Sequence, residues 1–164
     1  MYVLSKTKFG IEQSVYCMKL SFDYLIQIAC FFLFKDRAMD CLGSFLTALK
    51  ENQAKAQKLN ALIFSRYKDK NYELLKFLND SANCYKHSYL QAFADSLHGE
   101  EVPSVMTVHL KKGNTIAVSN GQYLQLIYAF NVSMAEAMNS IKDFVPDEVR
   151  GLIEQRENDP MGFV

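Results

Sequence analysis

The chain has 164 residues, of which 49% are hydrophobic and 22% charged, and its 18 basic side chains balance its 18 acidic ones. This composition excludes a disordered tail, a collagen-like repeat and a polybasic nucleic-acid arm. A chain of about 150 residues buries roughly 70% of the surface that its unfolded form exposes, so neither a disulfide nor a structural metal is needed. We expect one helical domain over residues 1–156 and a flexible tail over residues 157–164.

Long helices are predicted for the first hundred residues, because the chain has no proline before Pro103 and few glycines. The first helix is expected over about residues 9–34, and its nearly uniform apolar character places it at the centre of a bundle. A second helix over residues 36–67, with Asp36 as its N-cap, and a third over residues 71–97 should pack against each other, since only a short polar turn separates them.

The most apolar part of the first helix, from Leu20 to Phe34, raises the question of a membrane span. This run is shorter than the roughly 20 residues that a span requires, and it contains Asp23 and Gln27. We therefore expect a buried helix and no membrane association. The N-terminus also lacks the pattern of a secretion signal, so we expect a cytoplasmic protein.

After residue 103 the hydrophobic period changes to 2, which predicts a β-hairpin over about residues 104–119. A three-residue loop would pair Leu110 with Ile116 and Val108 with Val118, and would thereby place the large apolar side chains on one face. An isolated two-stranded ribbon is only marginally stable in water. The apolar face should therefore lie on the helices or on another chain.

A fourth helix over about residues 121–144, and a fifth that begins near Pro146, complete the predicted fold. The fold class is mainly α: a bundle of four or five helices with one inserted β-hairpin. The chain's nine Tyr, twelve Phe and seven Met supply more apolar surface than such a bundle needs. This surplus predicts a homodimer that buries the first helix or the hairpin, and the alternative is a larger monomeric core.

The densest polar cluster on an apolar stretch lies on the predicted third helix. Asn79, Asn83 and His87 recur every four residues and so share one strip of this helix. His87 could act as an acid or a base at neutral pH, and Asn83 and Lys86 could hold a phosphate. The alternative is a structural role, because polar side chains at the boundary of an apolar stripe usually form hydrogen bonds to a neighbouring element.

The string Asn83-Cys84-Tyr85-Lys86-His87 resembles the N-x-x-x-H end of the R-N-x-x-x-H motif of HEPN domains. These are compact helical bundles of bacterial toxin–antitoxin, phage-defence and RNA-processing proteins. In the active ribonucleases of that family an Arg precedes the Asn, and two protomers bring Arg and His together to cleave RNA. Here that position is Ala82, so the resemblance implies an inactive, binding-type member more readily than a nuclease.

Other chemistries have little support in the sequence. The histidines lie far apart at positions 87, 98 and 109, and we predict no metal site. The chain has no glycine-rich phosphate loop, and we predict no cofactor. The cysteines have no C-x-x-C spacing and fit buried thiols of a reduced cytosol. They are Cys17, Cys30, Cys41 and Cys84.

We therefore expect a non-enzymatic cytosolic binding or regulatory module of bacterial or phage origin, linked to defence or toxin–antitoxin systems. The expected partners are a second copy of the chain and another protein. RNA is less favoured, because the basic residues of the second predicted helix alternate with acidic ones. The alternative function is a metal-independent, HEPN-like ribonuclease or nucleotide-handling enzyme that uses His87, with Lys86 and Asn83 as phosphate ligands.

Overall fold

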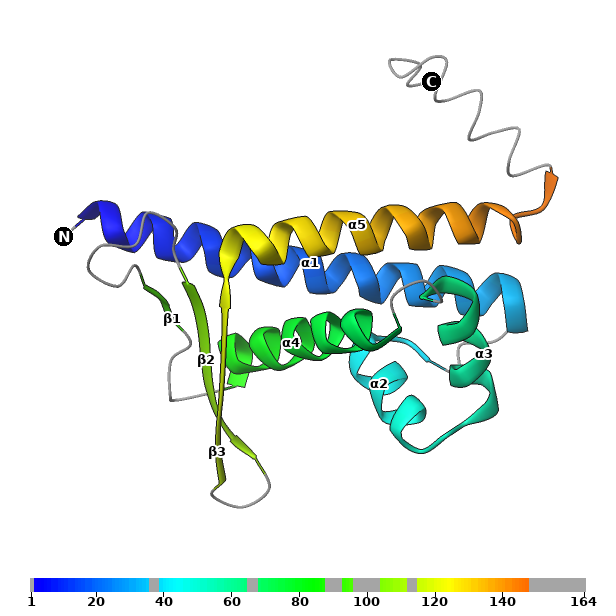
Figure 1. The fold of residues 1–164 in the computed structure, drawn as a ribbon, viewed down its shortest axis with the longest axis horizontal. Helices are drawn as coiled ribbons and strands as arrows, with labels where there is room; N and C mark the ends of the chain where they lie inside the picture. The colour runs from blue at the N-terminus through cyan, green and yellow to red at the C-terminus, as the bar shows by residue number, and fades with distance from the viewer. Residues whose placement is uncertain are drawn as a thin grey trace, which may run out of the picture.

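The computed structural model describes residues 2–35, 39–64, 68–87, 93–95, 104–111 and 115–147. Within these residues the elements follow one another as helix, helix, helix, helix, three strands and helix (Figure 1). Their bounds are α1 Tyr2–Phe34, α2 Leu42–Lys50, α3 Ala54–Ile63, α4 Lys68–His87, β1 Phe93–Asp95, β2 Ser104–Lys111, β3 Thr115–Gln122 and α5 Tyr123–Lys142. The prediction of a mainly helical bundle is confirmed.

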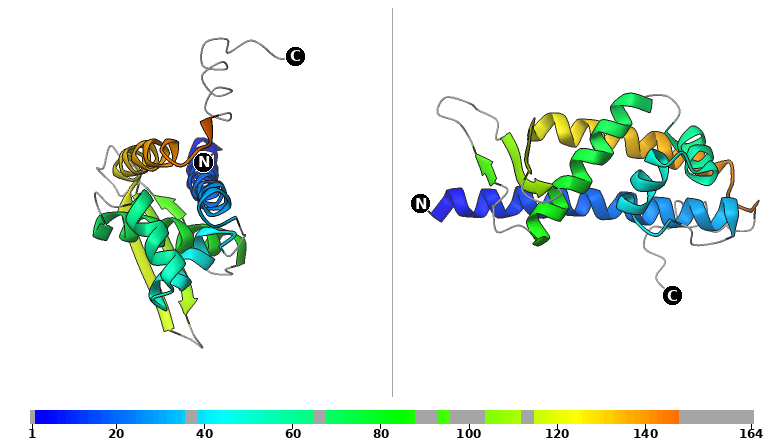
Figure 2. Two further views of the ribbon diagram at one scale, coloured as in Figure 1. Left: turned by 90° about the vertical axis from the view of Figure 1, so that its right-hand side faces the viewer. Right: turned by 90° about the horizontal axis from the view of Figure 1, so that it is seen from below.

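The helices form two layers, with α1 and α5 in one and α2, α3 and α4 in the other (Figure 2). Helices α1 and α5 are parallel. The Tyr123 hydroxyl near the start of α5 donates a hydrogen bond to Ser14 Oγ at 2.8 Å. Further along both helices, the rings of Phe130 and Phe22 meet edge to face with centroids 5.4 Å apart.

The core lies between the two layers, and α1 supplies much of it. Val15, Phe22, Ile26 and Cys30 of α1 are completely buried. The Phe22 ring also packs against Phe64, at the end of α3, with centroids 6.0 Å apart. This helix contacts α2, α4 and α5, which explains why its sequence is apolar on so many sides.

The prediction of one second helix over residues 36–67 is wrong, because the chain turns between α2 and α3. Asn52 has a φ of 55°, in the left-handed region. Its N–H donates to Leu49 O, and the Gln53 N–H donates to Ala48 O at 2.9 Å. These two bonds form a Schellman motif, which ends a helix, and asparagine tolerates the conformation better than most residues do.

The start of α2 also differs from the prediction. Asp36 lies outside the described residues, and the N-cap of α2 is Cys41. Its Sγ accepts the Ser44 N–H at 3.4 Å, while Ser44 Oγ accepts the Cys41 N–H at 3.2 Å. This reciprocal pair is a capping box with a thiol in place of the usual hydroxyl.

The third predicted helix, over residues 71–97, is too long at its C-terminal end. Helix α4 ends at His87, and Phe93–Asp95 form β1, which pairs antiparallel with β2. Phe93, the aromatic residue of this strand, fits a strand as well as a helix, so pairing with a neighbouring strand can override the helical pattern.

The strands are arranged in the order β1-β2-β3, and β2 is antiparallel to β3 with Val108 opposite Val118 and Leu110 opposite Ile116. The loop over residues 112–114 lies outside the described residues, so the inserted hairpin and its packing stay predictions. The fifth helix predicted near Pro146 and the tail over residues 157–164 also fall largely or wholly outside them. The fourth predicted helix corresponds to α5, within two residues at each end.

Candidate functional site

The residues that the sequence singled out for chemistry lie at the C-terminal end of α4. Asn83 is exposed, and Ala82, which occupies the position of the family arginine, is buried. Asn79 is half-buried and faces α2, where its Oδ1 would lie 3.3 Å from a Cβ added to Gly43. The side chains of Lys86 and His87 fall outside the described part, so the proposed catalytic grouping stays a prediction.

A different feature emerges on the opposite layer, along the outer face of α1. We use this name for the eight exposed residues of α1 between Phe9 and Phe34, a stretch that is described throughout. They recur mostly every three or four residues, on the side away from the buried Val15, Phe22 and Ile26. They are Phe9, Gly10, Gln13, Cys17, Tyr24, Gln27, Ile28 and Phe31.

None of the eight side chains is charged, and three of them are large aromatic rings. Phe9 is 63% exposed, Tyr24 56% and Phe31 62%. Monomeric proteins expose single apolar side chains routinely, but they rarely align several of them along one helix. The outer face of α1 therefore has the composition of a surface that another molecule covers.

The charged residues of this stretch are held on the inner and lateral sides of α1. Lys19 and Asp23 form an ion pair one helical turn apart, and their side chains are only 12% and 8% exposed. The second oxygen of Asp23 accepts the backbone N–H of Leu42 at 2.7 Å and so caps the first turn of α2. Glu12 is half-buried.

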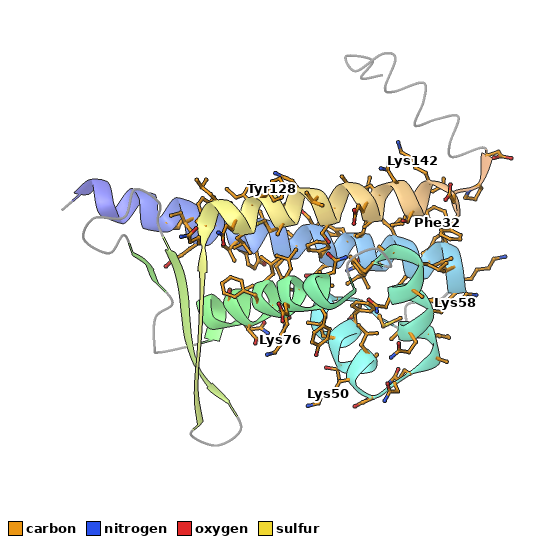
Figure 3. All side chains as sticks on the ribbon, viewed as in Figure 1. Phe32, Lys50, Lys58, Lys76, Tyr128 and Lys142 are labelled. Carbon is orange, nitrogen blue, oxygen red and sulfur yellow. The ribbon has the colours of Figure 1, made fainter. Side chains whose placement is uncertain are left out.

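The neighbouring helix α5 extends this uncharged surface. Its exposed residues from Leu124 to Asn139 are also uncharged. Among them, Tyr128 is 73% exposed and lies on the side of α5 that points away from α4 (Figure 3). They are Leu124, Gln125, Tyr128, Asn131, Ala135, Met138 and Asn139. Because α1 and α5 lie side by side, their outer faces belong to one layer of the molecule.

An open pocket of about 450 Å³ lies at the C-terminal end of α1. It is lined by Gln27, Ile28, Phe31, Phe32, Met39 and Asp40. The side-chain amide of Gln27 donates to the backbone oxygen of Asp40 at 2.6 Å and so ties this segment to α1. Hydrogen bonds from the side chains of Ser44 and then Cys41 lower the pKa of Asp40 below its usual value.

By length and composition, one described helix could cross a membrane: α1 between Phe9 and Phe34. This stretch is longer than the run from Leu20 to Phe34, because it begins at Phe9. The core helix of a soluble protein satisfies the same criterion, and 39% of the most apolar window is buried inside the molecule. Spanning a bilayer would remove residues such as Phe22 and Ile26 from their packing against the other helices.

Within the described residues no group of three or more His, Cys, Asp or Glu is arranged to hold a metal ion. Comparison with protein-family models, with characterised proteins and with solved structures finds no match to this chain. The candidate site therefore rests on the geometry of α1. The apolar surplus of this helix is visible in the sequence, but the side that the other elements leave uncovered is visible only in the structure.

Proposed function

We propose that this chain is a non-enzymatic helical binding module that acts by self-association through the outer face of α1. The observation that carries the proposal is the absence of charge among the exposed residues from Phe9 to Phe31. These positions span about 33 Å at 1.5 Å per residue. Such a face is suited to another helix, which binds through apolar side chains in the grooves between its neighbours.

The chemistry of this face argues against the other classes of function. Binding to nucleic-acid phosphates needs Lys or Arg, and none is exposed on α1 between Phe9 and Phe34. Acid–base catalysis needs a group that can exchange a proton, most often a histidine or a carboxylate. None of the eight exposed residues of α1 is a histidine, an aspartate or a glutamate. The exposed aromatic rings instead supply buried apolar area, which is the main favourable contribution to protein association.

Self-association also follows from the symmetry of a two-fold dimer. In such a dimer the same patch meets itself, so any charge near the axis meets an identical charge. A face without charge avoids this repulsion. The three exposed aromatic rings present roughly 350 Å², taking about 200 Å² for a whole aromatic side chain. The uncharged outer face of α5 enlarges this area toward the roughly 800 Å² per partner of a stable interface.

The biological setting is part of the proposal and rests on the HEPN-like resemblance of Asn83–His87. It supports a cytosolic regulatory role in bacterial or phage defence or toxin–antitoxin systems, with no membrane association. We also propose that β2 and β3 form the inserted hairpin, with its apolar face packed on the helices. The pairing of Val108 with Val118 and the contact between β2 and α4 support this part.

Sedimentation equilibrium at several concentrations tests the self-association. We expect a dimer for the full chain, and a monomer for the double variant Tyr24→Lys/Phe31→Lys, whose lysines would place charges in an otherwise uncharged, apolar interface. Tyr72→Lys is the matched control, because Tyr72 is an exposed tyrosine of α4 in the other layer. A monomeric wild type, or a double variant that dimerises as the wild type does, would contradict the proposal.

A further inference from the structure

The outer face of α1 has an internal symmetry that its residues make visible. Three pairs of exposed positions are equidistant from a point between Leu20 and Ser21: Gly10 with Phe31, Gln13 with Ile28, and Cys17 with Tyr24. In every pair the large side chain belongs to the C-terminal half of the helix, and the small or polar one belongs to the N-terminal half.

We infer that two copies of the chain pack their α1 helices antiparallel, about a two-fold axis at Leu20 and Ser21. This arrangement rests on the self-association proposed above. It places Phe31 of one copy level with Gly10 of the other, and Tyr24 level with Cys17. Each of the three pairs occurs twice in a two-fold dimer, so the interface contains six of these facing pairs.

Packing density favours this arrangement over the parallel one. Facing positions that alternate large and small side chains fill the space between two helices evenly. In a parallel pair, Phe31 would face Phe31 and Tyr24 would face Tyr24, while Gly10 would face Gly10. The helices would then be forced apart at one end and would leave a gap at the other. Antiparallel helices also align their dipoles favourably.

The two remaining exposed residues, Phe9 and Gln27, lie at one edge of the face. Phe9 is level with Phe32, and Gln27 is level with Ser14, and these two positions are half-buried in the monomer. Lipid is the less suitable occupant of this face. A helix that lies on a membrane surface usually carries Lys or Arg beside its apolar face, and no such residue is exposed on α1 between Phe9 and Phe34.

Disulfide crosslinking of the full chain tests the register. We expect Tyr24→Cys to form a covalent dimer under mild oxidation, with Cys17 of one copy bonded to position 24 of the other. Peptide mass spectrometry identifies the linked positions. The wild type should not link through Cys17, because the two Cys17 residues would lie seven residues, or about 10 Å, apart along the helices.

Two further variants test the same register. Tyr24→Cys/Cys17→Ser should lose the crosslink, since position 17, which lies opposite position 24, no longer carries a thiol. Gly10→Cys/Phe31→Cys in the Cys17→Ser background should regain it at the ends of the face. Positions 10, 24 and 31 are exposed in the monomer, so we expect these chains to fold, and circular dichroism checks this.

The outcomes separate the two proposals. A crosslink between two Cys17 residues in the wild type would show a parallel pair and overturn the register while self-association stands. A dimer in sedimentation that forms neither engineered crosslink would also overturn it. A wild type that sediments as a monomer would overturn both proposals. Flotation of the wild type with phosphatidylcholine–phosphatidylglycerol vesicles, in place of dimerisation, would assign the face to lipid and overturn both.

Discussion

Asp23 of α1 and the backbone N–H of Leu42, the first residue of α2, form a hydrogen bond of 2.7 Å across 19 residues of sequence. The carboxylate is almost completely buried, and its other oxygen pairs with Lys19. One side chain thus satisfies a free N–H of the first turn of α2 and fixes this helix to α1. These contacts also hold the negative charge of Asp23 away from the outer face of α1.

Replacing this carboxylate should destabilise the fold. We expect Asp23→Ala to lower the free energy of unfolding by about 2–4 kcal/mol, because it leaves both the Leu42 N–H and the Lys19 ammonium without their partner. Urea denaturation measures the change. Asp23→Asn keeps an acceptor for the N–H and should lose less. Equal losses for the two variants would mean that the charge, and not the cap, dominates.

The turn between α2 and α3 depends on the left-handed conformation of Asn52. Asn52→Gly should keep the turn and change the stability by no more than about 1 kcal/mol, because glycine adopts this conformation without strain. Asn52→Val should cost about 1–2 kcal/mol, since a β-branched residue is strained there. Thermal or urea unfolding compares the two, and a valine variant as stable as the wild type would show that Asn52 does not control the turn.

The close approach of α2 to α4 can be measured at Gly43. A methyl group at this position would lie 3.3 Å from Asn79 Oδ1, which is tighter than an ordinary van der Waals contact. Alanine also favours a helix by about 1 kcal/mol over glycine. We therefore expect Gly43→Ala to gain more stability in an Asn79→Ala background than in the wild type.

A double-mutant cycle of Gly43→Ala and Asn79→Ala isolates this contact from the helix propensity. The expected coupling is about 0.5–1 kcal/mol, because the two sites are in direct contact. Additive effects would show that the Asn79 side chain moves aside without cost.

The hydrogen bonds that Asp40 accepts predict a pH dependence. The side chain of Ser44, and then that of Cys41, lower the pKa of Asp40 below its usual value of 3.8. A lowered pKa in the folded state stabilises the protein above pH 3.8, and this stabilisation is lost as the pH falls through the folded-state pKa. Titration of the Asp40 carboxyl by NMR should give a midpoint that rises in Ser44→Ala.

Ser140→Ala is the matched control for this titration, because the Ser140 hydroxyl bonds to the backbone of Glu136 and lies on α5. It should leave the Asp40 midpoint unchanged. A midpoint that does not move in Ser44→Ala would contradict the assigned cause.

A non-enzymatic module should not cleave RNA. We expect no ribonuclease activity from the wild type, and therefore no difference in His87→Ala at an unchanged melting temperature. A fluorescent single-stranded RNA substrate provides the assay, with Asn83→Ala as a second variant of the HEPN-like string. Cleavage by the wild type that is lost in His87→Ala would replace the proposed function with the alternative enzyme.

The sequence by itself determined the two long helices. Helices α1 and α5 could be predicted to within a few residues of one end or both, because almost no proline or glycine interrupts these stretches. The break at Asn52 could not be predicted in the same way. Asparagine only permits a left-handed turn, and the packing of α2 and α3 decides whether the chain uses it.

The tertiary structure alone decided which side of α1 remains uncovered. The sequence shows apolar residues on most of its circumference, and any of them could have faced the core. Three neighbouring helices cover Val15, Phe22 and Ile26 and leave Tyr24, Ile28 and Phe31 exposed. Burial depends on where distant segments pack, and residues such as Phe130 and Leu42 lie too far along the chain for local periodicity to place them.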